Sequence, residues 1–164
     1  MPLHPIRTHR VGRAVLTSIT VLAAAAIGTA ATLPNIPTWY ASLHKPGFTP
    51  PNWLFGPAWS VLYLMMAVAF WRVLTLPNGT QGKRAAVAWF ILQVVLNAFW
   101  SVAFFGLHSP PLGLAVIALL AAAIVMTIAT FGRLDRLSAA MLVPYLLWVA
   151  FAASLNGAVF LMNR

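Results

Sequence analysis

The chain has 164 residues, 62% of them hydrophobic and 7% charged, and its ten lysines and arginines face a single acidic residue, Asp135. Soluble domains carry about 25% charged residues, so this composition excludes a water-soluble globular domain and indicates a chain solvated by lipid. The lone carboxylate argues against catalysis by paired carboxylates and against a proton relay, and the absence of cysteine excludes disulfides and thiolate metal sites.

Five apolar runs follow one another along the chain, each long enough for a membrane-spanning helix of about 20 residues. They cover about residues 14–33, 57–76, 85–107, 111–131 and 137–162. They lack the alternation of apolar and polar residues that is typical of a membrane β-barrel strand. The sequence therefore predicts an all-α integral membrane bundle of five transmembrane helices, residues 14–164, after a basic N-terminal tail, residues 1–13.

The first run, residues 14–33, resembles a cleaved signal peptide in having a basic segment before it and small residues at its end. Its length and the four spans that follow favour a retained helix. One face of this helix carries small residues, including Ala24 and Gly28, which allow close helix packing. That face serves either packing within the bundle or contact between two copies, and the sequence leaves both open.

The connection 34–56 is unusually long, which is typical of functional or disordered segments. It contains five aromatic residues and five prolines. Aromatic residues argue against disorder, and prolines lower the entropy cost of holding one conformation. An interfacial aromatic belt is the alternative, but the interleaving of aromatics with turn-forming residues favours an ordered cap loop, 34–56, over a cavity in the bundle.

Three of the later spans carry aromatic residues at helical spacing. The stripes are Trp59, Tyr63, Met66 and Phe70; then Trp89, Gln93, Asn97, Trp100 and Phe104; then Tyr145, Trp148, Ala152 and Asn156. Such stripes indicate either core packing or the walls of a pocket for a flat, amphipathic ligand. Amides are costly in lipid unless they are paired, so Gln93, Asn97 and Asn156 favour the pocket.

The basic residues are distributed unevenly between the two sides of the predicted bundle. Most lie in the tail 1–13 and near the joints at 72–84 and 133–136, which five antiparallel spans place on one side, whereas Lys45 and Arg164 fall on the other. The positive-inside rule predicts a multi-pass protein with a cytoplasmic N-terminus and an external C-terminus. Topology, with attraction to anionic lipid, thus explains the net charge of +9 better than nucleic-acid binding does.

The segment Trp39–Tyr63, WYASLHKPGFTPPNWLFGPAWSVLY, resembles the signature of the TspO/MBR family, also called the tryptophan-rich sensory protein, translocator protein or peripheral benzodiazepine receptor family. Two further stretches agree in the same order, Gln93–Gly106 (QVVLNAFWSVAFFG) and Val143–Asn156 (VPYLLWVAFAASLN). The resemblance covers residues 39–156 and rests on three tryptophan-rich motifs.

The resemblance implies a five-helix membrane protein, usually a homodimer, that binds tetrapyrroles such as protoporphyrin IX and haem, with sterol or drug-like ligands in parts of the family. We therefore expect a membrane porphyrin- and haem-binding protein that senses, sequesters or transports porphyrins in stress or tetrapyrrole regulation, with no obligatory cofactor. One alternative is a light-dependent porphyrin-degrading enzyme that oxidises through Trp59 and Trp148. Another is a sterol- or lipid-binding translocator. Because no acid–base or redox-metal group supports catalysis, binding without catalysis is favoured.

The resemblance and the stripes together select the candidate ligand-binding residues. By resemblance, Trp59 and Trp148 match the paired tryptophans of the family's pocket, and Ala152 matches a small position beside the ligand. The full set is Trp39, Trp53, Phe55, Trp59, Tyr63, Gln93, Asn97, Trp100, Trp148, Ala152, Leu155 and Asn156. The helix 85–107 is the more usual dimer face in this family.

Two further features concern particular ligands. His44 and His108 fall on the same outer side and could meet a haem iron, although a loop histidine is more often solvated, and we expect no metal site. Where animal members carry the tyrosine of a sterol motif, this chain has Gly157, and no basic residue completes the motif before Arg164. Sterol binding through that motif is therefore not expected.

Overall fold

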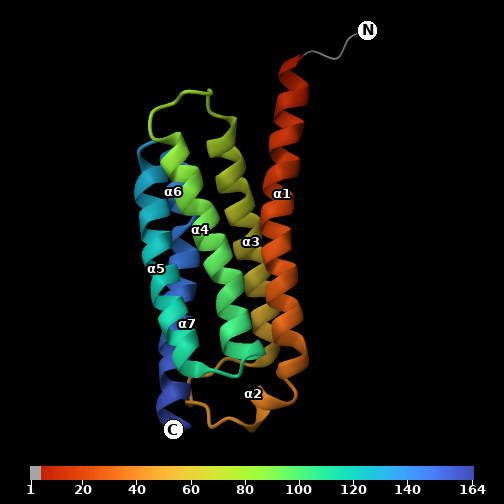
Figure 1. Ribbon diagram of the computed structural model, residues 1–164, viewed down its shortest axis with the longest axis vertical. Coiled ribbons are helices and arrows are strands. Elements are labelled where there is room, and N and C mark those ends of the chain that lie inside the picture. Colours follow the sequence, from red (N-terminus) through yellow and green to blue (C-terminus); the bar gives the residue numbers. More distant parts are fainter. Residues whose placement is uncertain (1–4) are drawn as a thin grey trace.

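The computed structural model describes the backbone of residues 5–164 and the side chains of residues 12–164. Every regular element in this part of the chain is helical (Figure 1). The elements are α1 (Pro5–Thr32), the 3₁₀ turn η1 (Leu33–Asn35), α2 (Trp39–Ser42), α3 (Asn52–Thr75), α4 (Lys83–Ser101), the π-helix η2 (Val102–Gly106), α5 (Pro110–Gly132), α6 (Arg136–Met141) and α7 (Val143–Met162).

Five segments are long and apolar enough to cross a bilayer, which confirms the predicted all-α bundle. They are Gly12–Asn35, Asn52–Thr75, Lys83–Gly106, Pro110–Gly132 and Arg136–Met162. The chain starts at one end of the bundle and finishes at the other (Figure 1). Helix α1 already begins at Pro5, within the segment expected to be a tail. The side chains of Arg7 and Arg10, counted there among the basic residues, lie outside the described residues.

The second span begins at Asn52 instead of near Pro57, so the long connection is shorter than expected. Pro51 takes an extended conformation, with φ −60° and ψ 142°, and the helix starts immediately after it. Pro57 stands inside the second turn of α3. Trp53 and Phe55 are consequently helical residues, and the connecting segment, which we call the cap, comprises residues 33–51.

The fifth span is interrupted near its start. Helix α6 ends at Met141 and α7 begins at Val143, with Pro144 in its first turn. The first backbone N–H groups of a helix have no hydrogen-bond partner within the helix. A proline in the first turn therefore costs the helix no hydrogen bond. The break lets α6 pack against α3 while α7 packs against α5.

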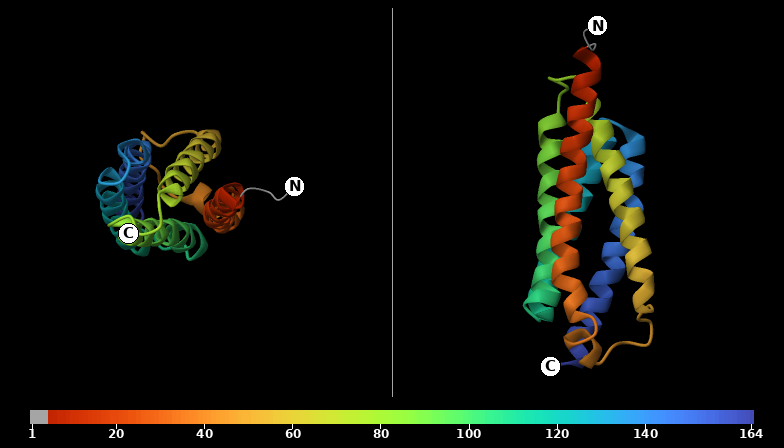
Figure 2. Two further views of the ribbon diagram at one scale, coloured as in Figure 1. Left: turned by 90° about the horizontal axis from the view of Figure 1, so that it is seen from above. Right: turned by 90° about the vertical axis from the view of Figure 1, so that its right-hand side faces the viewer.

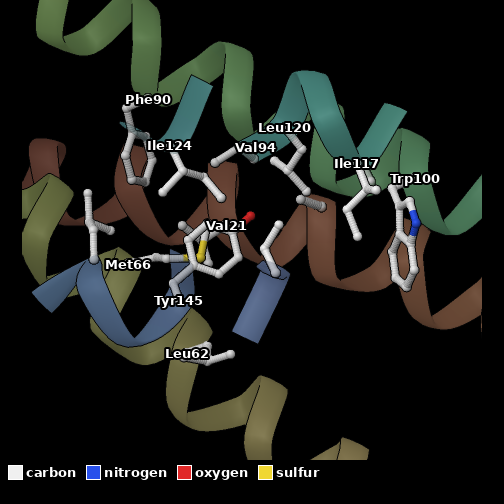
Figure 3. Packing of buried hydrophobic residues seen from close by; sticks show 14 of the residues in the cluster. Val21, Leu62, Met66, Phe90, Val94, Trp100, Ile117, Leu120, Ile124 and Tyr145 are labelled. Atoms are coloured by element: carbon white, nitrogen blue, oxygen red, sulfur yellow. The ribbon is translucent and has the colours of Figure 1, made fainter. Parts of the chain in front are cut away.

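The core lies where the helices meet around α4, which packs against α1 on one side and α5 on the other (Figures 1 and 2). Apolar side chains from all five spans interdigitate there (Figure 3). The largest of the fully buried ones include Tyr145, Phe70, Phe90, Phe131 and Met66. The rings of Phe70 and Phe90 stack with centroids 4.0 Å apart. Helix α3 diverges from the rest of the bundle toward the cap (Figure 2).

The single acidic side chain joins α3 to the turn between α5 and α6. Arg72 Nε lies 2.7 Å from Asp135 Oδ2, and Arg72 Nη2 lies 3.1 Å from Asp135 Oδ1. The Ser138 hydroxyl donates to the same carboxylate. The hydrogen bonds from Arg72, followed by the one from Ser138, lower the pKa of the Asp135 carboxyl to about 2. A bidentate pair of this kind fixes geometry as well as adding stability.

We expect Asp135→Asn to lower the thermal unfolding midpoint by a few degrees at neutral pH. Because the folded-state pKa is depressed, the stabilisation from this carboxylate is complete above its ordinary pKa near 4 and is lost as the pH falls toward about 2. The gap between wild type and variant should therefore be constant from pH 8 to 5 and close below pH 4. Asp135 is the only acidic side chain, so a gap as large at pH 2 as at pH 7 would contradict this assignment.

Candidate functional site

A cavity of about 480 Å³ lies between α1, α3, α4 and α7, at the end of the bundle that the cap covers. Its volume falls within the range of small-molecule sites. Its walls are Ala25, Gly28, Thr29 and Thr32 of α1; Leu33, Ile36 and Tyr40 of the cap; Asn52, Trp53, Phe55, Gly56, Trp59, Ser60 and Tyr63 of α3; Trp100, Ser101, Phe104 and Phe105 of α4 and η2; and Trp148, Ala152, Leu155 and Asn156 of α7. All of these residues are uncharged.

Two tryptophans form an aromatic corner between α3 and α7. The rings of Trp59 and Trp148 lie 6.5 Å apart at 84°. Tyr63 stacks on Trp59 at 5.3 Å, and Phe55 meets Trp148 edge-on at 6.0 Å. Rings arranged in this way support one another's orientation, so both indoles are held in place at the cavity wall.

The opposite wall depends on a local change of helix type. After Ser101 the chain forms the π-helix η2, in which the Leu107 amide donates to the Val102 carbonyl at 2.8 Å. A wider turn brings residues five apart onto a similar face, so Phe104 and Phe105 both reach the cavity beside Trp100. The ring of Trp100 stacks with that of Phe104 at 5.8 Å.

Gly28 forms part of the α1 wall of the cavity. A Cβ placed on Gly28 would lie 3.2 Å from Ser101 Oγ and 3.8 Å from the Tyr63 hydroxyl. The small residue therefore lets α1 approach α4 closely here, which assigns this position to packing within the bundle. Trp53 of α3, by contrast, is 71% exposed although it borders the cavity.

The cap contacts the rest of the bundle at two places. The ring of Trp39 stacks on that of His108 at 4.7 Å and 19°, and His108 Nε2 lies 2.8 Å from Asn35 Oδ1. Farther along, the His44 amide donates to Asn163 Oδ1 while Asn163 Nδ2 donates to the His44 carbonyl, both at 2.9 Å. These contacts hold the cap over the cavity.

The cap is also held internally. Lys45 Nζ donates to the carbonyls of Tyr40, Leu43 and Ala41 at 2.8, 3.1 and 3.3 Å. A cation at the end of a short helix satisfies carbonyls that the helix leaves unpaired. Tyr40 is buried beneath this turn, and burial raises the pKa of its hydroxyl, so it stays neutral.

One chain of hydrogen bonds leads from the cavity into the core. The Tyr63 hydroxyl donates to Asn97 Oδ1 at 2.8 Å, and Asn97 Nδ2 donates to the Tyr145 hydroxyl at 3.1 Å. Tyr63 borders the cavity, whereas Asn97 and Tyr145 lie behind it. Asn97 therefore orients Tyr63 without itself bordering the cavity.

A second amide orients a tryptophan. Asn156 Oδ1 accepts from Trp100 Nε1 at 3.3 Å, and Asn156 Nδ2 donates to the Pro110 carbonyl at 2.9 Å. Asn156 itself borders the cavity. The side chain thus links α7, α4 and the start of α5, at the point where Ser109 and two prolines begin α5.

The structure brings nine of the twelve predicted residues together around the cavity and leaves three away from it. Trp53, Phe55, Trp59, Tyr63, Trp100, Trp148, Ala152, Leu155 and Asn156 border it. Asn97 stands behind Tyr63. Trp39 packs on His108 and Phe104. Gln93 is 1% exposed, and neither polar atom of its side chain has a hydrogen-bond partner in the part of the chain that the structure describes.

The twelve predicted residues include none of α1, although the sequence identifies a small-residue face on this helix. Ala25, Thr29 and Thr32 border the cavity, but small residues in an apolar helix give no signal that separates a cavity wall from packing. Phe105 was missed because ordinary helical spacing turns it away from Trp100. Ser101 could have been found, since it lies one turn from Asn97 on the stripe already identified.

The walls of the cavity are largely apolar and aromatic. Between residues 12 and 164, no group of three or more histidine, aspartate or glutamate side chains lies close enough together to hold a metal ion. His44 and His108 lie in the cap and the α4–α5 turn and do not border the cavity. Aromatic faces, a few hydroxyls and two amides, Asn52 and Asn156, are suited to a flat ligand with sparse polar groups.

Comparison with known proteins agrees with this arrangement. The sequence profile of the TspO/MBR family matches residues 16–162. The chain is 40% identical to the tryptophan-rich protein TspO of Archaeoglobus fulgidus over 149 residues, which is 91% of this chain and 95% of that protein. It is 36% identical over 118 residues to the tryptophan-rich sensory protein of Cereibacter sphaeroides, covering 72% of each chain.

A more distant relative extends the comparison to animals. The chain is 33% identical to the human translocator protein over 127 residues, which is 77% of this chain and 75% of that protein. The residues that the TspO/MBR profile matches, 16–162, include every residue that borders the cavity. With five membrane-spanning helices, an aromatic cavity beneath a cap and a profile match over nearly its whole length, the chain is a multi-pass integral membrane protein and belongs to the TspO/MBR family.

Proposed function

We propose that the protein binds a tetrapyrrole, such as protoporphyrin IX or haem, in the cavity beneath the cap. The observation that carries this proposal is the aromatic corner of Trp59 and Trp148 in a cavity with uncharged walls. A macrocycle is flat and apolar over most of its area, so it matches two indole faces and an apolar wall. No obligatory cofactor is needed for such binding.

The role that fits this site is sensing, sequestration or passage of porphyrins. A relative named translocator protein and another named sensory protein support a membrane role of this class. Sterol or lipid binding is the alternative ligand class. Photo-oxidative degradation would need the same two indoles, and the loss of pigment on illumination, compared between wild type and a Trp59→Phe/Trp148→Phe variant, tests it.

Tryptophan-fluorescence quenching by protoporphyrin IX tests the proposed binding directly in detergent-purified protein. We expect saturable quenching in the wild type and an affinity several-fold weaker in Trp148→Phe, because the variant loses one of the two indoles that form the corner. Trp89→Phe is the matched control, since Trp89 belongs to α4 but does not border the cavity. Its affinity should equal that of the wild type.

The same titration separates the ligand classes. Cholesterol added as a competitor should leave the porphyrin affinity unchanged, whereas full displacement would favour a sterol site. Quenching that never saturates, or that saturates with equal affinity in both variants, would contradict binding at the corner.

We also propose that the N-terminus is cytoplasmic and that the protein forms a homodimer. Arg13, Arg84 and Arg136 belong to the same end of the bundle (Figure 1), which supports the orientation. The chain has no cysteine, so a single cysteine introduced by Gln81→Cys or Gly47→Cys reports which side of the membrane that position occupies. An impermeant maleimide should label only Cys at position 47 in intact cells. Light scattering of the detergent complex tests the dimer.

A further inference from the structure

Some of the residues that border the cavity are also exposed at the surface of the bundle, and all of these lie on one side of it. They belong to α1, to the turn η1 that follows α1, and to α3. The bordering residues of α4, η2 and α7 are buried or half-buried. A residue that both borders a cavity and is exposed lies where the cavity opens. The opening therefore lies between α1 and α3, and we call it the lateral mouth: Thr29, Leu33, Asn52, Trp53, Gly56 and Ser60.

Helical spacing explains why α1 borders this opening. The helix packs against α4 and also against α3. Ala24 and Ile27 lie on its α4 side. Ala25 and Thr29 follow them by one and two residues, and each residue turns the helix by about 100°, so they lie on a different flank. A homodimer that meets through the outer face of α4 therefore leaves the lateral mouth facing lipid.

The same spacing separates two flanks of α3. Phe55 and Trp59 contact Trp148 of α7, with ring centroids 6.0 and 6.5 Å apart. Gly56 and Ser60 each follow one of these rings by one residue, which turns them about 100° away from α7. Toward the cap, α3 diverges from the rest of the bundle (Figure 2). The aromatic rings thus close the cavity toward α7, and the small residues lie at its open side.

Small and uncharged side chains form the part of the rim that lies between the two helices. They are Ala25 and Thr29 of α1, and Gly56 and Ser60 of α3. A Cβ placed on Gly56 would have no neighbouring atom within 4 Å, so no side chain packs on α3 there. The Ser60 hydroxyl donates to the Gly56 carbonyl at 2.9 Å, which makes it compatible with an apolar solvent.

The mouth lies at the depth of the lipid chains. The first span ends at Asn35 and the second begins at Asn52. Thr29 and Ser60 lie six and eight residues inside these ends, or about 9 and 12 Å. Each of the two spans has 24 residues and is about 36 Å long, only about 3 Å more at each end than hydrocarbon about 30 Å thick. Both residues therefore lie in the hydrocarbon of the leaflet on the cap side.

We propose that the ligand of the cavity enters and leaves sideways through the lateral mouth, from the hydrocarbon of the leaflet on the cap side. The proposal rests on the proposed tetrapyrrole function, and it requires a ligand that dissolves in lipid before it binds. Entry past the cap would have to break the stacking of Trp39 on His108 or the two hydrogen bonds between His44 and Asn163. Entry through the mouth breaks none of these contacts.

Stopped-flow tryptophan quenching by protoporphyrin IX in proteoliposomes tests this route. Gly56→Phe and Thr29→Phe should each slow both association and dissociation several-fold, because a benzyl group at the rim obstructs the passage. The equilibrium affinity should change less than the rates, since both directions are slowed. Val61→Phe and Ala30→Phe add the same ring at exposed positions of the same helices that do not border the cavity, and they should keep the rates of the wild type.

Asn163→Ala tests the alternative route past the cap. This variant loses both hydrogen bonds to His44, and we expect its association rate to equal that of the wild type. Faster association in Asn163→Ala, together with wild-type rates in Gly56→Phe and Thr29→Phe, would mean that the ligand enters past the cap. A loss of affinity in the two rim variants with an unchanged association rate would make the rim part of the binding site and would also contradict the proposal.

A spin label tests the position of the mouth without any porphyrin. A nitroxide attached to the cysteine of Ser60→Cys should collide more often with dissolved oxygen, which concentrates in lipid, than with a water-soluble nickel chelate. A nitroxide at Gly47→Cys, on the exposed cap, should show the opposite preference. Equal access of the chelate to both positions would mean that the mouth opens to water. Absence of saturable quenching in the wild type would instead contradict the tetrapyrrole site, so the two failures are distinguishable.

Discussion

Replacing Ala152 by phenylalanine should weaken protoporphyrin IX binding by at least about tenfold, or 1.4 kcal/mol. Ala152 is 9% exposed, borders the cavity and lies one helical turn from Trp148. A benzyl group at this position would project into the space that the macrocycle is proposed to occupy. Because the added group fills a cavity instead of packed core, the protein should still fold. Saturation of tryptophan quenching measures the affinity.

The matched control is Ala150→Phe, two residues earlier on α7. Ala150 is exposed and does not border the cavity, so its replacement adds the same volume to the lipid-facing surface. The control should bind with wild-type affinity. Equal affinity in Ala152→Phe and wild type, with both unfolding at the same temperature, would mean that the ligand does not enter this cavity.

Gly113→Ala should destabilise the protein, because α5 and α7 meet too closely at this point for a methyl group. A Cβ on Gly113 would lie 2.6 Å from Asn156 Oδ1 and 3.1 Å from Phe104 Cδ2. Overpacking of this kind costs about 1–3 kcal/mol. The Asn156 amide would have to turn and release Trp100 Nε1 or the Pro110 carbonyl. We therefore expect a lower unfolding midpoint together with a shifted Trp100 emission.

Gly157→Ala provides the control on the facing helix. There a Cβ would meet Leu114 Cδ2 at 3.8 Å, an ordinary contact. The change gains helix propensity of up to about 1 kcal/mol without a clash, so its midpoint should equal or exceed that of the wild type. If Gly113→Ala were as stable as Gly157→Ala, the close approach at Asn156 would not exist.

The spans and much of the cavity could be predicted because each rests on a strong local signal. Apolar runs of helical length define the spans, and the spacing of Trp59 and Tyr63, or of Trp148 and Ala152, defines a face. Neither signal needs knowledge of the neighbouring helices. The resemblance added Trp53 and Leu155, which no stripe includes, and both border the cavity.

The remaining differences arise from tertiary contacts and local helix geometry. Trp39 is drawn out of the cavity by its stacking on His108, a residue 69 positions away in the chain. Asn97 satisfies its polar atoms between two tyrosines instead of facing a ligand. The π-helix turns Phe105 toward the cavity, and nothing in the local sequence predicts this change of helix type. Sequence periodicity assumes regular helices, so it fails where one departs from regularity.

The pairing of His44 with Asn163 has a consequence for the order in which the protein is made. The two residues are 119 positions apart, so His44 leaves the ribosome long before its partner is synthesised. Domains of this size emerge at about 5–20 residues per second. The hydrogen bonds between His44 and Asn163 can therefore form only several seconds after the cap is synthesised, when α7 has been inserted. Biosynthesis of the last helix completes the binding chamber, and a nascent chain stalled before α7 should hold no porphyrin.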